Sequence, residues 1–129
     1  MAKIFTPLLI LFLCAAALQA QEAERDLVAD AVKNGNAKTL ASYFTAGVNL
    51  TVDRKDEVYS REQAEVIMTR FFANHVPGDF AIRHEGKSKL DDHYYIGDLS
   101  TGNGNYRVTF FMKRESDGFR IRQLRIEAD

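Results

Sequence analysis

Residues 58–78, VYSREQAEVIMTRFFANHVPG, carry the strongest local signal in the chain. Ser60 is followed three residues later by Gln63, the spacing of a capping box, so we expect a helix that starts near Arg61. Its apolar face would contain Ala64, Ile67, Met68, Phe71 and Phe72. The pair Pro77-Gly78 would end it. An apolar face with this much aromatic mass predicts a helix that packs on a core.

From residue 79 the hydrophobic period changes to two and stays there. This pattern predicts four strands, at about 79–87, 92–101, 105–114 and 118–127. The connections between them are too short for a parallel crossover, which needs a dozen or more residues, so the strands should form an antiparallel meander. Helices followed by such a meander indicate an α+β fold with the helices on one face of the sheet.

The segment before residue 58 predicts smaller elements. Residues 22–34 and 37–44 have apolar residues at helical spacing, with Gly35 and Asn36 between them as a stop and a cap. Residues 48–52 alternate apolar and polar side chains, as in a half-buried strand. The charged residues 54–57 are expected to form a turn.

Two strands of the meander change phase along their length. In the last strand the apolar residues pass from odd to even positions near Gln123, and in the second they change parity at Gly97, between Ile96 and Leu99. Each change predicts a β-bulge, which bends a sheet, so we expect a cone that encloses one helix. The core should consist mostly of Phe44, Ile67, Phe71, Phe80, Ile96, Val108, Phe110, Ile121 and Ile126.

The first residues, MAKIFTPLLILFLCAAALQA, have the order of a secretory signal peptide: Lys3, an apolar run over 8–18, then small residues. The run is too short to span a membrane, which takes about twenty apolar residues. We expect residues 1–20 to be removed, leaving a single domain over 21–129 that is periplasmic or secreted. The alternative is lipid attachment at Cys14, which would anchor the protein to a membrane.

Composition excludes several classes of function. The formal net charge of −1 argues against nucleic-acid binding, which depends on neutralising many phosphates. Cleavage after residue 20 removes the one cysteine, so a disulfide framework or thiolate chemistry is not expected. His75, His84 and His93 do not have metal-ligand spacing, and the loop at 102–105 enters a strand rather than a helix. We therefore expect no metal and no cofactor.

The stretches VYSREQAEVIMTRFF (58–72) and GNYRVTFFMK…IRQLRIE (104–113 and 121–127) resemble the nuclear transport factor 2-like, or cystatin-like, superfamily. In particular they resemble a secreted bacterial domain family of unknown function. The resemblance covers residues 22–128 and implies a cone-shaped α+β fold. The superfamily contains isomerases, dehydratases and non-catalytic binding modules, so the resemblance does not decide the activity.

Enzymes of this superfamily use an ionisable residue inside the cone, typically an Asp or a His–Asp pair with a Tyr. By parity, His84 shares the apolar face of the first meander strand, and Asp98 at the Gly97 bulge would turn inward with Tyr94 nearby. These three are the candidates for an acid–base isomerase, dehydratase or hydrolase. The alternative is that His84 is solvated and that Asp98 caps the bulge. We favour this reading, and with it a non-catalytic domain.

The other face of the meander predicts a binding surface. Its candidate binding residues are Arg107, Phe111, Arg120, Arg122 and Arg125, with Arg83, Lys113, Glu85 and Glu127 among them. Arginine beside an exposed aromatic ring suits a protein interface, and superfamily members often dimerise through this face. The alternative is a solvated face. We therefore expect an envelope domain that binds a small apolar ligand in its cone or a protein, with a homodimer through the open sheet face.

Overall fold

The computed structural model describes residues 19–129. A helix over residues 19–33 is followed by α2 (Ala37–Ser42), β1 (Phe44–Val52), β2 (Lys55–Ser60), α3 (Arg61–Asn74), β3 (Pro77–Lys87), β4 (His93–Thr101), β5 (Gly104–Glu115) and β6 (Gly118–Ala128). The predicted signal peptide lies outside the described residues, apart from residues 19 and 20, and its cleavage stays a prediction. No helix within residues 19–129 is long and apolar enough to cross a membrane.

Helix α3 confirms the capping-box prediction at its first residue. The Ser60 hydroxyl accepts a hydrogen bond from the Gln63 backbone N–H at 3.2 Å, and the Gln63 side chain accepts one from the Ser60 N–H at 3.1 Å. Two N–H groups at the helix start are thereby satisfied. The helix ends at Asn74, before the extended backbone of Pro77.

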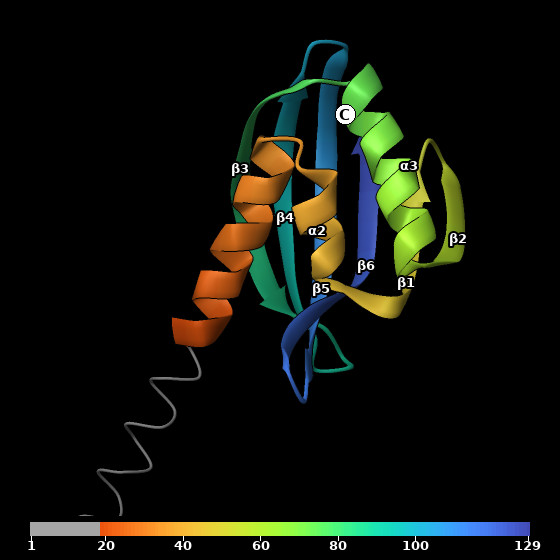
Figure 1. The fold of residues 1–129 in the computed structure, drawn as a ribbon. Helices are drawn as coiled ribbons and strands as arrows, with labels where there is room; N and C mark the ends of the chain where they lie inside the picture. The colour runs from red at the N-terminus through yellow and green to blue at the C-terminus, as the bar shows by residue number, and fades with distance from the viewer. Residues whose placement is uncertain (1–18) are drawn as a thin grey trace, which may run out of the picture.

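The strands form one six-stranded sheet in the order β2-β1-β6-β5-β4-β3. The expected antiparallel meander is present as β3–β6, but the prediction of a four-stranded sheet is wrong. Strand β1 pairs with β6 in parallel and adds β2 at the edge, so the sheet is mixed. All the helices lie on one face of the sheet, with the first helix over β3 and β4 and α3 over β1 and β6 (Figure 1). The opposite face carries no helix; we call it the open face.

The β1–β2 hairpin is the element that the sequence patterns did not reveal. Asp53 and Arg54 both have positive φ, 53° and 66°, and connect Val52 directly to its partner Lys55. Such a two-residue turn matches the twist of the flanking strands. The predicted turn at residues 54–57 is therefore wrong, because most of it is strand. Its charges suit an edge strand, where they discourage pairing with another chain.

Of the two predicted bulges, the one in the last strand is confirmed, and the one in the second meander strand is wrong. In β6, Arg122 is the extra residue, since Met112 is opposite Ile121 and Phe111 is opposite Gln123. The second bulge lies opposite Gly97, but on β3. Strand β4 itself pairs with β5 without a shift, so its parity does not change. The extra residue of β3 is Arg83, since Ile82 is opposite Gly97 and His84 is opposite Ile96.

The regular alternation of β4 decides the facing of Ile96, which was predicted to be a core residue. Buried Tyr95 and Leu99 face the helices, so Ile96 between them faces the other way and the prediction that it is a core residue is wrong. Ile67 is only partly buried. The other predicted core residues are buried: Phe44, Phe71, Phe80, Val108, Phe110, Ile121 and Ile126.

Candidate functional site

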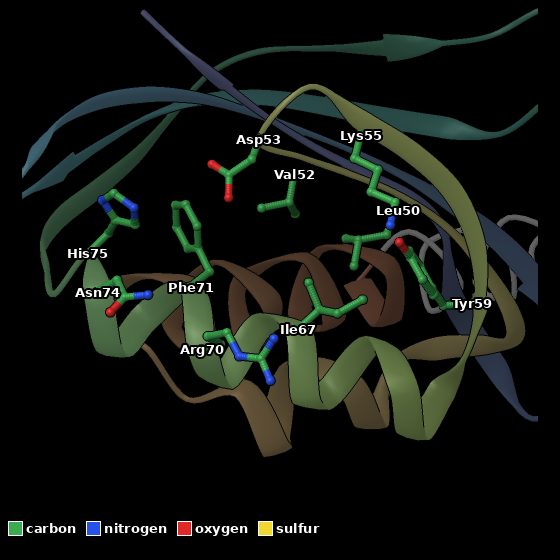
Figure 2. Close-up of a pocket in the computed structure, with 10 residues that line it drawn as sticks. All are labelled: Leu50, Val52, Asp53, Lys55, Tyr59, Ile67, Arg70, Phe71, Asn74 and His75. Carbon is green, nitrogen blue, oxygen red and sulfur yellow. The ribbon is translucent and has the colours of Figure 1, made fainter.

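A pocket of about 360 Å³ lies between α3 and the β1–β2 hairpin, on the helix side of the sheet (Figure 2). Ligand pockets for small molecules start at roughly 300 Å³, so the volume suits a small ligand. It is lined by Leu50, Val52, Asp53, Lys55, Tyr59, Ile67, Arg70, Phe71, Asn74 and His75. The β1–β2 hairpin forms one wall of the pocket, and α3 with its C-cap residue forms the other.

Apolar side chains form the middle of the pocket. Leu50 and Val52 are alternate residues of β1, and both are buried on the helix-covered face. Ile67 and Phe71 are one turn apart on α3, so their side chains lie on the same side of the helix. In Figure 2 these four side chains lie between helix and hairpin. An apolar ligand would exclude water from them on binding.

Polar groups lie at the two ends of the pocket. Asp53, Asn74 and His75 are at one end, and Lys55 and Tyr59 are at the other (Figure 2). Burial, followed by the neighbouring Glu57 carboxylate, raises the pKa of the Tyr59 hydroxyl above its ordinary value, although Lys55 opposes the shift. Tyr59 therefore remains a neutral hydrogen-bond donor at physiological pH.

The His75 ring is held in place at the C-terminal end of α3. It stacks on Phe71 with ring centroids 4.6 Å apart, and its Nδ1 lies 3.2 Å from the Tyr106 hydroxyl. His75 is half-buried and is the C-cap residue of the helix. These contacts orient one side of the ring toward β5, so His75 is a fixed wall of the pocket.

The three candidate catalytic residues are not in this pocket. His84 follows the Arg83 bulge and is exposed, and its position opposite Ile96 places it on the open face. The parity assignment that pointed His84 into the cone is wrong, because parity counted through a bulge gives the opposite face. The favoured reading, in which His84 is solvated, agrees with its exposure.

Tyr94 and Asp98 also lie on the open face, since both alternate with the inward-facing Tyr95. Asp98 is paired with Arg83 at 3.2 Å, and the Tyr94 ring lies beside Phe111 with centroids 5.8 Å apart. The expected inward placement of these two residues is therefore also wrong.

The candidate binding residues divide into two groups. Arg107, Phe111 and Arg125 lie on the open face as expected, since they alternate with buried core residues of β5 and β6. Arg107 pairs with Asp129 at 3.8 Å, and Arg125 pairs with Glu127 at 3.4 Å. Cations and acids therefore alternate on this face.

Arg120 and Arg122 are occupied within the molecule. Arg122 pairs at 2.6 Å with Asp92, whose side chain is 7% exposed. Arg120 pairs at 2.6 Å with Asp117, which lowers the pKa of that carboxyl through their hydrogen bond. These two arginines hold loops, so the expectation that they form a free binding surface is wrong.

Glu85 is a further correction to the predicted surface. It stands opposite the buried Tyr95 and pairs with Arg25 of the first helix at 3.2 Å. The β3 bulge again explains the difference, because Glu85 follows it. Residues 19–129 contain no cluster of three or more His, Cys, Asp or Glu side chains able to hold a metal ion.

Sequence reasoning missed the pocket because it missed β2. Phe71 and Ile67 were expected in the core, and Leu50 and Val52 in a short strand, but nothing placed them opposite one another. The signal that was available is the alternation from Val48 to Val52 followed by Asp53-Arg54, a pattern compatible with a tight hairpin.

A bent sheet with helices on one face, and a pocket beneath the last of them, defines a domain of the nuclear transport factor 2-like, or cystatin-like, fold. The family model described as "Domain of unknown function (DUF4783)" matches residues 25–127, and the chain belongs to this family. No curated protein matches the chain.

Solved structures agree with this assignment. A DUF4783 family protein from Bacteroides fragilis YCH46 is 35% identical, with a TM-score of 0.75 over 80% of this chain and 96% of that one. Two more distant structures share the fold alone. A nuclear transport factor 2-like protein of unknown function from Silicibacter pomeroyi DSS-3 is 13% identical, with a TM-score of 0.61 over 90% of this chain and 98% of that one. A domain of unknown function with a cystatin-like fold from Nostoc punctiforme is 12% identical, with a TM-score of 0.66 over 88% of this chain and 78% of that one.

Proposed function

We propose that this protein is a non-catalytic binding domain of the bacterial cell envelope, and that the pocket between α3 and the β1–β2 hairpin takes a small ligand with an apolar body. The observation that carries the proposal is the pocket's composition: an apolar middle of Leu50, Val52, Ile67 and Phe71 between two polar ends. Pockets that orient small molecules commonly combine an apolar lining with a few polar groups.

Two further observations support a binding role over acid–base catalysis. The residues that were the alternative candidates for a catalytic group, His84, Asp98 and Tyr94, lie on the opposite face of the sheet from the pocket. In the pocket itself, His75 has one ring nitrogen beside the Tyr106 hydroxyl and its ring stacked on Phe71. This arrangement favours a rigid wall over a mobile proton carrier.

A neutral probe tests the proposal directly. The isotope-labelled protein is titrated with 4-phenylbutanamide while the backbone amide resonances are followed. We expect shifts to concentrate on α3 and the β1–β2 hairpin. Ile67→Glu should weaken binding roughly tenfold or more, because the ligand would bury the new carboxylate. Leu90→Glu is the matched control, since Leu90 is 73% exposed and outside the pocket. No binding, or shifts scattered over the surface, would refute the proposal.

Export is the second part of the proposal. It is supported by the sequence order of residues 1–20, in which one positive charge precedes an apolar run and a small-residue site. The test is N-terminal sequencing and mass measurement of protein recovered from the periplasm or medium. A first residue of Gln21 supports the proposal, whereas cleavage before Cys14 with an attached lipid, or an intact Met1, contradicts it.

A second candidate function is self-association through the open face. Tyr94 and Phe111 lie side by side there, and Val58 on the same face is 70% exposed. The ion pairs Arg83–Asp98 and Arg125–Glu127 place both charge signs on the surface, so a second copy related by a two-fold axis can match them. This balance favours a second copy over a strongly acidic partner.

A further inference from the structure

We propose that the preferred ligands of the pocket are small organic acids, whose carboxylate binds Arg70 while the apolar body rests on Ile67 and Phe71. This inference rests on the binding function proposed above and adds the chemical class of the ligand. It assigns Arg70 as the residue that determines specificity.

The first argument is that Arg70 is available. Within residues 19–129 it makes no ion pair and no side-chain hydrogen bond, although it lines the pocket. Most other arginines are engaged by protein groups: Arg25, Arg61, Arg83, Arg107, Arg120, Arg122 and Arg125. A guanidinium at the edge of an apolar pocket, with its donors unused, is suited to bind an acceptor from a ligand.

The second argument is the spacing along α3. Ile67 lies three and four residues before Arg70 and Phe71, and Asn74 lies four and three residues after them, so the four share one side of the helix. A ligand whose ring or short chain lies on Ile67 and Phe71 is therefore next to Arg70. The pocket volume of about 360 Å³ limits the body to a single ring or a short chain.

The third argument is the charge of the lining. Lys55 and Arg70 are cations and Asp53 is the acid, and no ion pair within the described residues joins Asp53 to either cation. Within residues 19–129 Lys55 has one ion pair, a loose one with Glu57 at 3.7 Å, and Glu57 does not line the pocket. A carboxylate fits this imbalance, whereas an amine of the same size meets two positive charges. Arginine also binds a carboxylate through two parallel hydrogen bonds.

The experiment compares three probes that share a carbon skeleton. The protein is titrated by calorimetry with 4-phenylbutanoate, 4-phenylbutanamide and 4-phenylbutylamine at neutral pH and low salt. We expect the acid to bind about tenfold more tightly than the amide, and the amine most weakly. The advantage of the acid should shrink as salt is added, because the site is partly open to solvent.

Variants at Arg70 test the assignment of that residue. Arg70→Gln should lower the affinity for the acid about tenfold, to the level of the amide, and leave amide binding unchanged. Arg70→Lys keeps the charge without the paired donors, so it should give an intermediate affinity. Arg54→Gln is the matched control, because Arg54 is an exposed cation in the nearby turn and outside the pocket lining.

Each outcome decides one of the proposals. If acid and amide bind the wild-type protein equally, or if Arg70→Gln weakens both alike while circular dichroism is unchanged, the preference for acids through Arg70 is refuted and the binding function stands. If none of the three probes binds, both proposals fail.

Discussion

At the β3 edge of the sheet the first helix is tied to the strands by polar side chains, whereas at the β2 edge α3 leaves a pocket. Gln21 donates to the Tyr95 hydroxyl at 3.0 Å, Arg25 pairs with Glu85 at 3.2 Å, and Lys33 lies 3.7 Å from Asp79. The polar ties of α3 are at its two ends: Arg61 donates to the Phe44 carbonyl at 3.0 Å at the start. At the other end the Asn74 carbonyl accepts from the Asn103 side chain, and the His75 ring lies 3.2 Å from the Tyr106 hydroxyl. Between its two ends, α3 buries Ala64, Met68 and Phe72 in the core, while Ile67 and Phe71 line the pocket opposite the hairpin.

The two edges differ in the side chains that the covering helix directs toward the sheet. The helix at the closed edge contributes charged and amide groups that reach the sheet. The part of α3 over the hairpin contributes Ile67 and Phe71, and its polar residues Arg70 and Asn74 remain on the rim. The pocket therefore lies along the part of α3 that has few polar ties to the strands.

The largest expected effect is at Gly97, where β3 and β4 are packed most tightly. A Cβ added there would lie 2.5 Å from the Phe80 ring and 2.7 Å from the Ala81 carbonyl oxygen. Gly97→Ala should lower the free energy of unfolding by about 3 kcal/mol, because backbone must move to relieve the contact. Urea denaturation measures the loss. Gly102→Ala is the control, since a Cβ there meets nothing within 4 Å, and equal effects at the two sites would contradict the close packing.

The buried ion pair that holds the β3–β4 loop should give the next largest effect. Asp92→Asn leaves Arg122 beside a neutral group, and we expect a loss of about 2 kcal/mol, below the range for fully buried pairs because Arg122 is 35% exposed. Asp91→Asn tests the neighbouring acid, whose side chain is 85% exposed, and should change stability by less than about 0.5 kcal/mol. Thermal melts of both variants measure the two losses, and equal losses would contradict a stabilising role of the Asp92–Arg122 pair.

The edge of the sheet that could be predicted from the sequence is the one whose sequence patterns extend over many residues. The four-strand meander and the start of α3 were predicted because they rest on long alternation and on a capping box with both partners present. The hairpin edge was not, because Lys55, Asp56 and Glu57 carry the charges of a turn although they form a strand. The parallel pairing of β1 with β6 joins segments far apart in sequence, and no local pattern encodes it.

The candidate site was predicted least well, for a geometric reason. Counting by twos places a side chain on a face only while the strand is regular, and the extra residue at Arg83 exchanges the faces of His84 and Glu85. The phase change read at Gly97 was not a bulge in β4, which is regular: Ile96 is an apolar residue on the open face. The bulge lies on the paired strand β3, and its extra residue, Arg83, leaves no mark in the apolar pattern of β4.

A smaller effect is expected when the tie between the first helix and β4 is removed. Tyr95→Phe leaves the buried Gln21 amide without its acceptor and should cost about 1 kcal/mol. Tyr94→Phe is the control, because within residues 19–129 the Tyr94 hydroxyl makes no hydrogen bond. Denaturation at pH 7 measures the free energy of unfolding of both variants. Equal losses would show that the hydrogen bond from Gln21 to the Tyr95 hydroxyl does not stabilise the fold.

The same residue gives a pH dependence. Burial raises the pKa of Tyr95 above its ordinary value of 10.0, although the hydrogen bond from Gln21 opposes the shift. The unfolded chain therefore loses this proton first as pH rises. The contribution of Tyr95 is complete below about pH 10 and is lost as the pH passes through the raised folded pKa. The stability of the wild-type protein should fall more steeply than that of Tyr95→Phe over this range.

The smallest effect on stability is expected on the open face, although the effect on assembly would be large. Phe111→Asp should change the free energy of unfolding by about 1 kcal/mol or less, because the residue points away from the helices. It should convert the proposed dimer to a monomer in analytical ultracentrifugation, whereas Leu90→Asp, a change at another exposed apolar residue, should not. A wild-type protein that is monomeric at high concentration would remove the dimer proposal.

In a regular strand, removing one residue moves every following side chain to the other face of the sheet. The extra residue in β3 is an exception, because here the length of the strand and the facing of its side chains are independent. Because Arg83 takes no partner in the ladder, deleting it would leave His84 opposite Ile96 and Glu85 opposite Tyr95, each still on its present side. What such a deletion would change is the bend of the edge, since a bulge is where a strand kinks. At this one place, chain length sets the curvature of the sheet without moving the following residues to the other face; the open face would lose only Arg83 and its ion pair with Asp98. Relatives that differ here by one residue would keep the same interior around a differently shaped cone.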